Sequence, residues 1–154
     1  MRTLRGMINT MSEEKDFFDE LEELTLADAR KIYSRKVIEH FMNPRNYGEL
    51  ENPDGYTFMS GICGDTIGIY VAMERGRIAR ASFVTNGCGA TIACGSALTS
   101  MAKGLTVSEA QSISGDDLAG YLDGLPVENT HCADLAVNTL KGALAKIELG
   151  KEAS

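Results

Sequence analysis

Three cysteines in this sequence stand where a protein can hold a reactive or metal-bound sulfur. Cys63 lies in the turn-like segment "GICGD", which also supplies Asp65; Cys88 lies between two glycines in "NGCGA"; and Cys132 follows His131 in "THC". Cys88 and Cys132 are both expected at the start of a helix, where free N–H groups and the helix dipole favour a thiolate. Three thiolates with one carboxylate or imidazole suit iron or zinc. If these segments meet, they form a candidate metal site.

The fourth cysteine, Cys94, is predicted to serve packing. It follows Cys88 by six positions, and six helical residues turn the chain by about 600°, which points the two side chains in different directions. Its neighbours Ala93, Gly95 and Ala97 form a small-residue surface suited to close helix packing. The gaps between the four cysteines, 25, 6 and 38 positions, match no zinc-finger spacing.

The spacing alone leaves other readings open. Cysteines in a reducing compartment are often inert buried hydrophobes, and Asp65 could simply cap a turn. The same donors could hold zinc in a structural or regulatory site. A thiol enzyme built on His131 and Cys132 is disfavoured, because adjacent helical residues point about 100° apart and cannot readily form a nucleophile–base pair.

Length, charge and hydropathy narrow the class of protein. A chain of 154 residues suggests one domain, and its formal net charge of −7 argues against a nucleic-acid partner. No apolar run approaches the roughly 20 residues of a membrane span, so no membrane association is expected. The beginning of the chain lacks the apolar core of a secretory signal and becomes acidic by Glu13. We therefore expect a cytoplasmic protein.

The middle of the chain predicts three antiparallel strands over 55–61, 66–73 and 78–85. The second alternates apolar and other residues, which is typical of a strand with one buried face. A three-residue hairpin loop at 74–76 is expected, because a two-residue loop would bring polar side chains among the isoleucines. The predicted pairs are Val71 with Ala79, Ile69 with Ala81, and Ile67 with Phe83.

Along the sequence, helices are expected both before and after the three strands. An acidic amphipathic helix should follow Ser12, and a second helix, capped by Thr25, should run to just before Asn43. Further helices are expected over 90–103, 107–112, 116–122 and 130–149, the last ending at Gly150. This order predicts an α+β fold: a three-stranded antiparallel sheet with helices packed on one face, an N-terminal helix and a long C-terminal helix. The predicted domains are an acidic extension over 1–25, a folded domain over 26–150 and a tail over 151–154.

Four motifs in chain order carry a specific family resemblance. They are "YSRKVIEHFMNPRNYG", "CGD", "GCGATIA" and "HC", which span the chain from Tyr33 to Cys132. This combination resembles the IscU/NifU-type iron–sulfur cluster assembly scaffold proteins, and the similarity continues through the last helix, over about 120 residues. "CGD" alone would be a weak signal, whereas the four motifs together are highly specific.

The resemblance implies roles for the candidate residues. Cys63, Cys88 and Cys132 would be the cluster and persulfide cysteines, Asp65 the carboxylate that keeps the cluster labile, and His131 an auxiliary ligand. The implied cargo is a transient 2Fe–2S cluster built from iron, with zinc as an alternative occupant.

The resemblance also implies partners. A cysteine desulfurase would deliver sulfur as a persulfide, and recipient apo-proteins would take the finished cluster. The protein would act as a scaffold, not an enzyme, and a homo-oligomer is one form it could take. The family's chaperone-recognition segment Leu-Pro-Pro-Val-Lys is altered at 125–129, where this chain reads "LPVEN", so a chaperone partner is less firmly implied.

Among the three cysteines that the resemblance implies as ligands, Cys132 is the predicted persulfide acceptor. Its place at a helix start should lower the pKa of the thiol, and the preceding loop "DGLPVEN" should let it reach a partner. Cys88 is expected in a more recessed position, with Gly87 and Gly89 leaving room for iron and sulfide.

Overall fold

The computed structural model describes residues 27–62 and 64–153 of the chain. It separates into two compact units, which divide between Tyr33 and Ser34. In the first unit the described residues 27–32 are helical. The expected acidic helix after Ser12, the Thr25 cap and the domain boundary near residue 25 lie outside the described residues and stay predictions.

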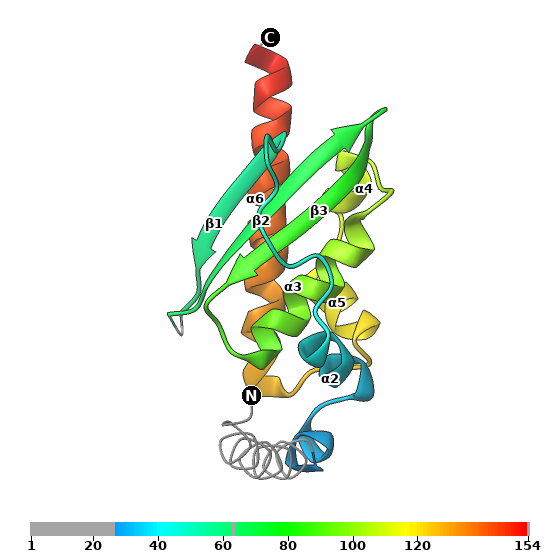
Figure 1. The fold of residues 1–154 in the computed structure, drawn as a ribbon, viewed down its shortest axis with the longest axis vertical. Coiled ribbons are helices and arrows are strands. Elements are labelled where there is room, and N and C mark those ends of the chain that lie inside the picture. The colour runs from blue at the N-terminus through cyan, green and yellow to red at the C-terminus, as the bar shows by residue number, and fades with distance from the viewer. Residues whose placement is uncertain (1–26, 63, 154) are drawn as a thin grey trace, which may run out of the picture. The chain divides into compact units, whose positions relative to one another are not determined.

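A three-stranded antiparallel sheet forms the centre of the second unit (Figure 1). Its strands are β1 (Gly55–Ser60), β2 (Thr66–Glu74) and β3 (Arg77–Thr85), in the order β1-β2-β3. The side chains of Ile67, Ile69 and Val71 alternate along β2 and are completely buried. The predicted strands and their antiparallel order are confirmed.

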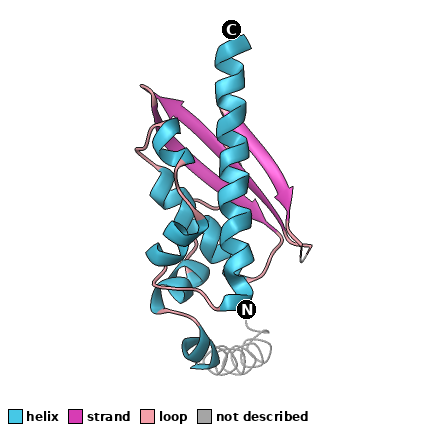
Figure 2. Cartoon of the chain, turned by 180° about the vertical axis from the view of Figure 1, so that it is seen from behind, coloured by secondary structure: helices cyan, strands magenta, loops and turns pink. Residues whose placement is uncertain are grey.

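Helices pack on one face of this sheet (Figure 2). The helices in contact with the strands are α3 (Gly89–Ala102), which lies along β3, and the long α6 (Thr130–Ala153), which lies along β1 and β2. The shorter elements are α2 (Arg35–Met42), α4 (Val107–Gln111), α5 (Gly115–Tyr121) and the 3-10 turn η1 (Val127–Asn129). The α+β class is therefore confirmed. Within the described residues, none of the helices combines the length and hydrophobicity needed to cross a membrane.

The predicted register between β2 and β3 is wrong by two residues. Ile67 pairs with Thr85, Ile69 with Phe83, and Val71 with Ala81. The hairpin turn has two central residues, Arg75 and Gly76, both with positive φ, as the right-handed strand twist favours. An irregularity between Ala72 and Met73 leaves Ala79 unpaired. This bulge keeps both Ile78 and Ala81 buried despite the short turn, so the objection to a two-residue loop does not apply.

Two predicted helix boundaries are also wrong. The helix expected to run unbroken to Asn43 is interrupted at Ser34, whose hydroxyl accepts the Val37 N–H at 3.0 Å and caps α2. The same hydroxyl donates to the Leu122 carbonyl at 2.5 Å, a partner 88 residues away that local sequence cannot reveal. At the other end, α6 continues through Gly150 to Ala153, since a single glycine lowers helix stability without ending a long helix.

Aromatic side chains occupy the sheet face opposite the helices. Tyr70 stacks on Tyr56 with ring centroids 5.8 Å apart and meets the edge of Phe58 at 5.9 Å. Phe58 lies over Gly68, where a β-carbon would overlap its ring. Tyr70 is thereby nearly buried on a face that no described helix covers, while Tyr56 and Phe58 remain half exposed.

Candidate metal centre

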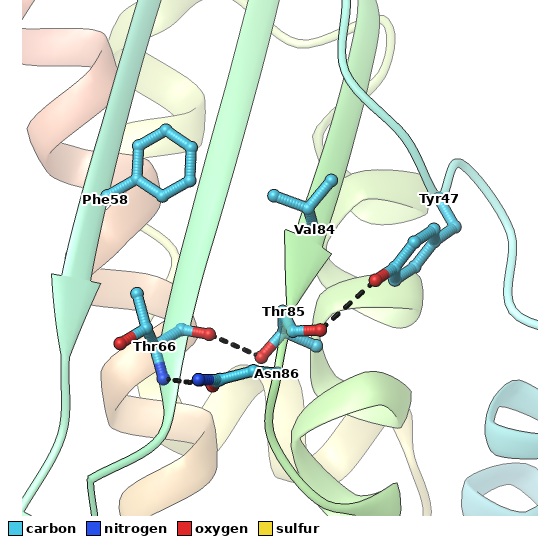
Figure 3. A pocket seen from close by; sticks show the side chains of 6 residues that line it. All are labelled: Tyr47, Phe58, Thr66, Val84, Thr85 and Asn86. Carbon is cyan, nitrogen blue, oxygen red and sulfur yellow. Dashed lines mark hydrogen bonds between the residues drawn. The ribbon is translucent and has the colours of Figure 1, made fainter.

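Hydrogen bonds at one end of the β2–β3 ladder hold the segments that lead into the candidate site. The Thr85 hydroxyl donates to the Thr66 carbonyl at 2.6 Å, and the Thr66 N–H donates to Asn86 Oδ1 at 2.8 Å (Figure 3). Asp65 directly precedes Thr66, and Cys88 comes two residues after Asn86. The ends of β2 and β3 therefore bring Asp65 and the segment that leads to Cys88 together at one end of the sheet.

A shallow pocket lies next to these hydrogen bonds at the ends of β2 and β3 (Figure 3). Its lining residues are Tyr47, Phe58, Thr66, Val84, Thr85 and Asn86. The Tyr47 hydroxyl donates to the Thr85 carbonyl at 3.1 Å, which ties the loop before β1 to the end of β3. The pocket shares Thr66, Thr85 and Asn86 with the hydrogen bonds at the strand ends, whereas Asp65 and Cys88 are not among its lining residues.

Cys88 is the N-cap residue of α3, as the sequence predicts for a cysteine at a strand-to-helix corner. Its residue is exposed. Burial of part of the thiol raises its pKa, but hydrogen bonds from the Thr91 N–H and hydroxyl and from the Ala90 N–H outweigh that effect. The charge of Asp65 opposes them, yet the pKa of Cys88 remains lowered overall. The helix start therefore favours a thiolate at an accessible position.

The hydroxyl of Thr91 connects three of the candidate groups. Thr91 Oγ1 lies 3.0 Å from Asp65 Oδ2, 3.4 Å from Cys132 Sγ and 3.8 Å from Cys88 Sγ. Thr91 itself is completely buried in the first turn of α3. One hydroxyl thus brings together side chains from the β1–β2 loop, the start of α3 and the start of α6.

Sequence reasoning did not single out Thr91. The available signal was a threonine three residues after a helix-capping cysteine, in a turn otherwise made of small and apolar residues. Its importance depends on Asp65 and Cys132, which are 26 and 41 positions away.

The two glycines beside Cys88 have different neighbours. A β-carbon at Gly87 would lie 2.8 Å from Asp65 Oδ2 and 2.9 Å from Thr91 Cβ, so glycine is needed for the carboxylate to sit there. A β-carbon at Gly89 would instead lie 3.1 Å from the ring of Phe41. At both glycines a neighbouring side chain occupies the space that a β-carbon would take, and the expectation that they leave room for iron and sulfide stays a prediction.

His131 and Cys132 lie at the start of α6, and their side chains approach each other. His131 Nε2 is 3.6 Å from Cys132 Sγ. Cys132 is only 1% exposed, since it faces Thr91 on α3. The expected contrast between a recessed Cys88 and an accessible Cys132 is therefore wrong: Cys88 is the exposed thiol and Cys132 the buried one.

Cys94 lies inside α3 and is completely buried, as its packing role requires. Burial, and to a smaller extent the charges that Cys132 and Cys88 can carry, raises the pKa of this thiol far above its ordinary value. A thiol held neutral in this way is a poor metal ligand and a poor nucleophile.

The structure describes only some of the predicted ligands. Cys63 lies outside the described residues, next to Ile62, which is 95% exposed, and Gly64, which has a φ of +89°. Among the residues that the structure describes, no three side chains of His, Cys, Asp or Glu are gathered so that they could hold a metal ion as they stand. The arrangement brings Asp65, Cys88 and Cys132 around one hydroxyl, with His131 beside Cys132.

The sequence is similar to proteins of known family. The model of the NifU-like N terminal domain matches residues 32–153. "Iron-sulfur cluster assembly scaffold protein IscU 1" of Archaeoglobus fulgidus is 45% identical over 114 residues, which cover 73% of this chain and 74% of that protein. "Iron-sulfur cluster assembly scaffold protein IscU" of Escherichia coli is 38% identical over 126 residues, covering 79% of this chain and 98% of that protein.

The fold is similar to that of solved structures. The N-terminal NifU-like protein of Brucella abortus matches with a TM-score of 0.64 at 20% identity, covering 77% of this chain and 95% of the other. At that identity the likeness concerns the fold alone. The domain match covers the four sequence motifs together with the sheet and the helices that pack on it. This chain therefore belongs to the family of NifU-like N terminal domains.

Proposed function

We propose that this protein is a scaffold on which a 2Fe–2S cluster is assembled and from which it is passed to apo-proteins. The observation that carries the proposal is the convergence of Asp65, Cys88 and Cys132, from three separate segments, within 3.8 Å of one hydroxyl. Its relatives in Archaeoglobus fulgidus and Escherichia coli are named as iron–sulfur cluster assembly scaffolds, which supports the same role here.

In this proposal Cys63, Cys88 and Cys132 supply the thiolates that hold iron. Asp65 or His131 supplies the remaining, weaker ligand. A carboxylate oxygen or an imidazole in place of a fourth thiolate makes the cluster easier to release, which suits a protein whose cluster is cargo. Because a carboxylate beside Cys63 gives solvent or recipient thiols a weak point of entry to the cluster, Asp65→Ala should lengthen the lifetime of the bound cluster and slow its transfer. The half-life of the cluster under an anaerobic chelator challenge tests this, and an unchanged half-life would contradict it.

Sulfur would arrive from a cysteine desulfurase as a persulfide, and Cys132 is the proposed acceptor. The Cys132 thiolate attacks the outer sulfur of the desulfurase persulfide, so that a new S–S bond forms at Cys132 while the donor S–S bond breaks. The donor cysteine leaves as a thiolate. Reduction of the transferred sulfur to sulfide then takes two electrons, which a pair of external thiols can supply by forming a disulfide.

The burial of Cys132 adds a condition to this step. Its sulfur lies against Thr91, so the start of α6 must move away from α3 before a donor can reach it. Mass spectrometry after a single turnover with the desulfurase tests the assignment. The proposal expects the persulfide on Cys132, whereas a persulfide carried by exposed Cys88 and missing from Cys132 would refute it.

The proposed partners follow from the same role. They are a cysteine desulfurase and recipient apo-proteins, with a chaperone as a further candidate although the segment at 125–129 departs from the family pattern. A cytoplasmic location and a homo-oligomeric form remain predictions.

Anaerobic reconstitution with ferrous iron, sulfide and the desulfurase tests the function itself. Absorption and Mössbauer spectra should show a 2Fe–2S cluster in the wild-type protein. Cys63→Ser, Cys88→Ser and Cys132→Ser should each impair its formation, while Cys94→Ser, the matched control, should leave it nearly intact. Loss of the signal in Cys94→Ser together with its retention in Cys63→Ser would show the ligand assignment to be wrong.

Zinc is the competing occupant, because thiolate, carboxylate and imidazole donors also suit tetrahedral zinc. A dedicated zinc site would bind zinc tightly and would block cluster formation under the reconstitution conditions. A scaffold would exchange zinc for iron and sulfide when all three are supplied.

A further inference from the structure

Thr91 differs from the other buried helical threonines in what its hydroxyl contacts. Thr99 donates to the Gly95 carbonyl at 2.8 Å and also accepts from Asn46 at 3.1 Å, and Thr139 donates to the Leu135 carbonyl at 2.7 Å, so both donate within their own helices. Thr91 is equally buried, yet its hydroxyl lies against the Asp65 carboxylate and the Cys132 sulfur. Its hydrogen-bond partners are therefore side chains of the candidate site.

The hydroxyl carries one proton, and several acceptors surround it. The shortest contact is to Asp65 Oδ2 at 3.0 Å, which is a good geometry for donation to a carboxylate. Cys132 Sγ at 3.4 Å is the alternative acceptor of the same proton. Because the hydroxyl has only one proton, donation to the nearer and charged Asp65 carboxylate is favoured, while both cysteine sulfurs lie within 3.8 Å of the Thr91 oxygen.

The hydrogen bond from Thr91 to Asp65 fixes where the carboxylate points. Gly87 leaves the space in which Asp65 Oδ2 sits, and Thr91 supplies the donor that keeps it there. A carboxylate without this donor could rotate towards solvent, because Asp65 is only partly buried. Thr91 also contacts both described cysteines of the site, so it sets the carboxylate in relation to the sulfurs.

We propose that Thr91 is a positioning residue, whose hydroxyl holds the Asp65 carboxylate beside the Cys88 and Cys132 sulfurs and so determines whether Asp65 takes part in the metal site. This inference rests on the proposed function. Thr91 acts through Asp65 and need not bind the cluster itself. Removal of its hydroxyl should therefore reproduce the effect of removing the carboxylate.

Cobalt(II) provides a readout that does not depend on cluster assembly, because its absorption bands report the ligands around the metal. Thr91→Val removes the hydroxyl while keeping the shape of the side chain, and Thr91→Ser keeps the hydroxyl. The expected result is that Thr91→Val changes the cobalt spectrum in the same way as Asp65→Ala, while Thr91→Ser retains the wild-type spectrum. Thr99→Val is the matched control, since it removes an equally buried hydroxyl whose partners, the Gly95 and Ser96 carbonyls and the Asn46 side chain, lie outside the candidate site.

A double-mutant cycle on cluster transfer gives the second readout. Thr91→Val should change the transfer rate in the same direction as Asp65→Ala, by about tenfold to a hundredfold, which is the range that corresponds to one hydrogen bond to a charged group. In the Asp65→Ala background the same substitution should have almost no further effect. Additive effects, or a Thr91→Val spectrum no different from that of Thr99→Val, would overturn the inference.

The two levels of proposal can be told apart. If the wild-type protein binds cobalt and assembles a cluster but Thr91→Val matches Thr99→Val, only the role of Thr91 fails. If the wild-type protein does neither, the proposed function fails and this inference with it. Thr91→Ala, which removes the same hydroxyl with a smaller side chain, is measured in parallel, so that a folding defect in one variant does not decide the result.

Discussion

Individual thiols in this protein differ in both exposure and pKa. Cys88 is exposed and its pKa is lowered, Cys132 is 1% exposed, and Cys94 is fully buried with a strongly raised pKa. Because the thiolate is the reactive form, these differences should appear directly in the rates at which the cysteines react with an alkylating reagent.

We predict that iodoacetamide labels Cys88 before Cys132 in the metal-free protein and leaves Cys94 unlabelled until the protein unfolds. The lowered pKa of Cys88 means that its labelling rate should rise with pH and level off at a lower pH than that of a free cysteine. Peptide mass spectrometry over a pH series measures this, and labelling of Cys94 ahead of Cys88 would contradict the structure.

At the scale of elements, α3 packs on β3 through a glycine. A β-carbon at Gly95 would lie 2.5 Å from the ring of Phe83, which is itself completely buried. Gly120 in α5 is also helical, but a β-carbon there would meet nothing within 4 Å. The two glycines therefore form a matched pair for testing the packing of α3.

Gly95→Ala should lower the free energy of unfolding by about 1–3 kcal/mol, because the added methyl group overpacks a filled core. Gly120→Ala should raise it by about 0.5–1 kcal/mol, since alanine favours the helix and nothing obstructs it. Urea unfolding followed by circular dichroism measures both. A stabilising Gly95→Ala would mean that Phe83 does not lie against α3.

A second link between elements is the buried His40, which fastens α2 to α3. His40 Nδ1 lies 2.7 Å from the Ser96 hydroxyl, and that hydroxyl also accepts the Arg45 N–H at 2.8 Å. Burial lowers the pKa of His40, the charges of Arg45 and Lys36 lower it further, and Glu39 partly opposes them. The folded protein therefore holds this histidine neutral at a pH where the unfolded chain would bind a proton.

The sign of the resulting pH effect follows from the lowered pKa. The stabilising contribution is complete above the unfolded pKa of about 6.5 and is lost as the pH falls from there through the folded pKa. We expect the wild-type protein to lose stability between pH 7 and pH 5.5, and His40→Asn to lose less over the same interval. Equal slopes in the two proteins, measured by urea unfolding, would remove His40 as the cause.

For the molecule as a whole, a metal bound at the candidate site should increase the stability of the folded protein. The candidate ligands come from the β1–β2 loop, α3 and α6, so a metal bound by them would join segments that separate on unfolding. Any ligand that binds the folded state alone stabilises it by mass action.

Zinc at about a hundredfold excess over its Kd should raise the Tm of the wild-type protein by roughly 5–10 °C. The increase should be much smaller in Cys88→Ser and nearly unchanged in Cys94→Ser, and a chelator should reverse it. Differential scanning calorimetry measures the midpoints. An equal increase in all three proteins would place the zinc elsewhere on the molecule.

Local features of the sequence were enough to predict most of the elements. The apolar residues along β2 predicted the strand, and the structure confirms it, although residues on both of its faces are buried and not on one face alone. The Thr106–Glu109 capping box at the start of α4 and the positive φ of Gly104 after α3 also act over a few residues. The four motifs likewise indicated the family, and the domain match confirms it. These predictions succeeded because strand periodicity and helix capping depend on neighbours along the chain.

Only the tertiary structure decided how the elements meet. The bulge at Ala79 allows the residues before and after it, Ile78 and Ala81, both to be buried. The helix is interrupted at Ser34, whose hydroxyl forms a hydrogen bond with the Leu122 carbonyl, 88 positions away. The exposure of Cys88, the burial of Cys132 and the position of Thr91 between them depend on α6 packing against α3, over a separation of 41 residues. The sequence determined which residues could do the chemistry, whereas the contacts between distant segments determined which thiol faces solvent and which hydroxyl stands among them.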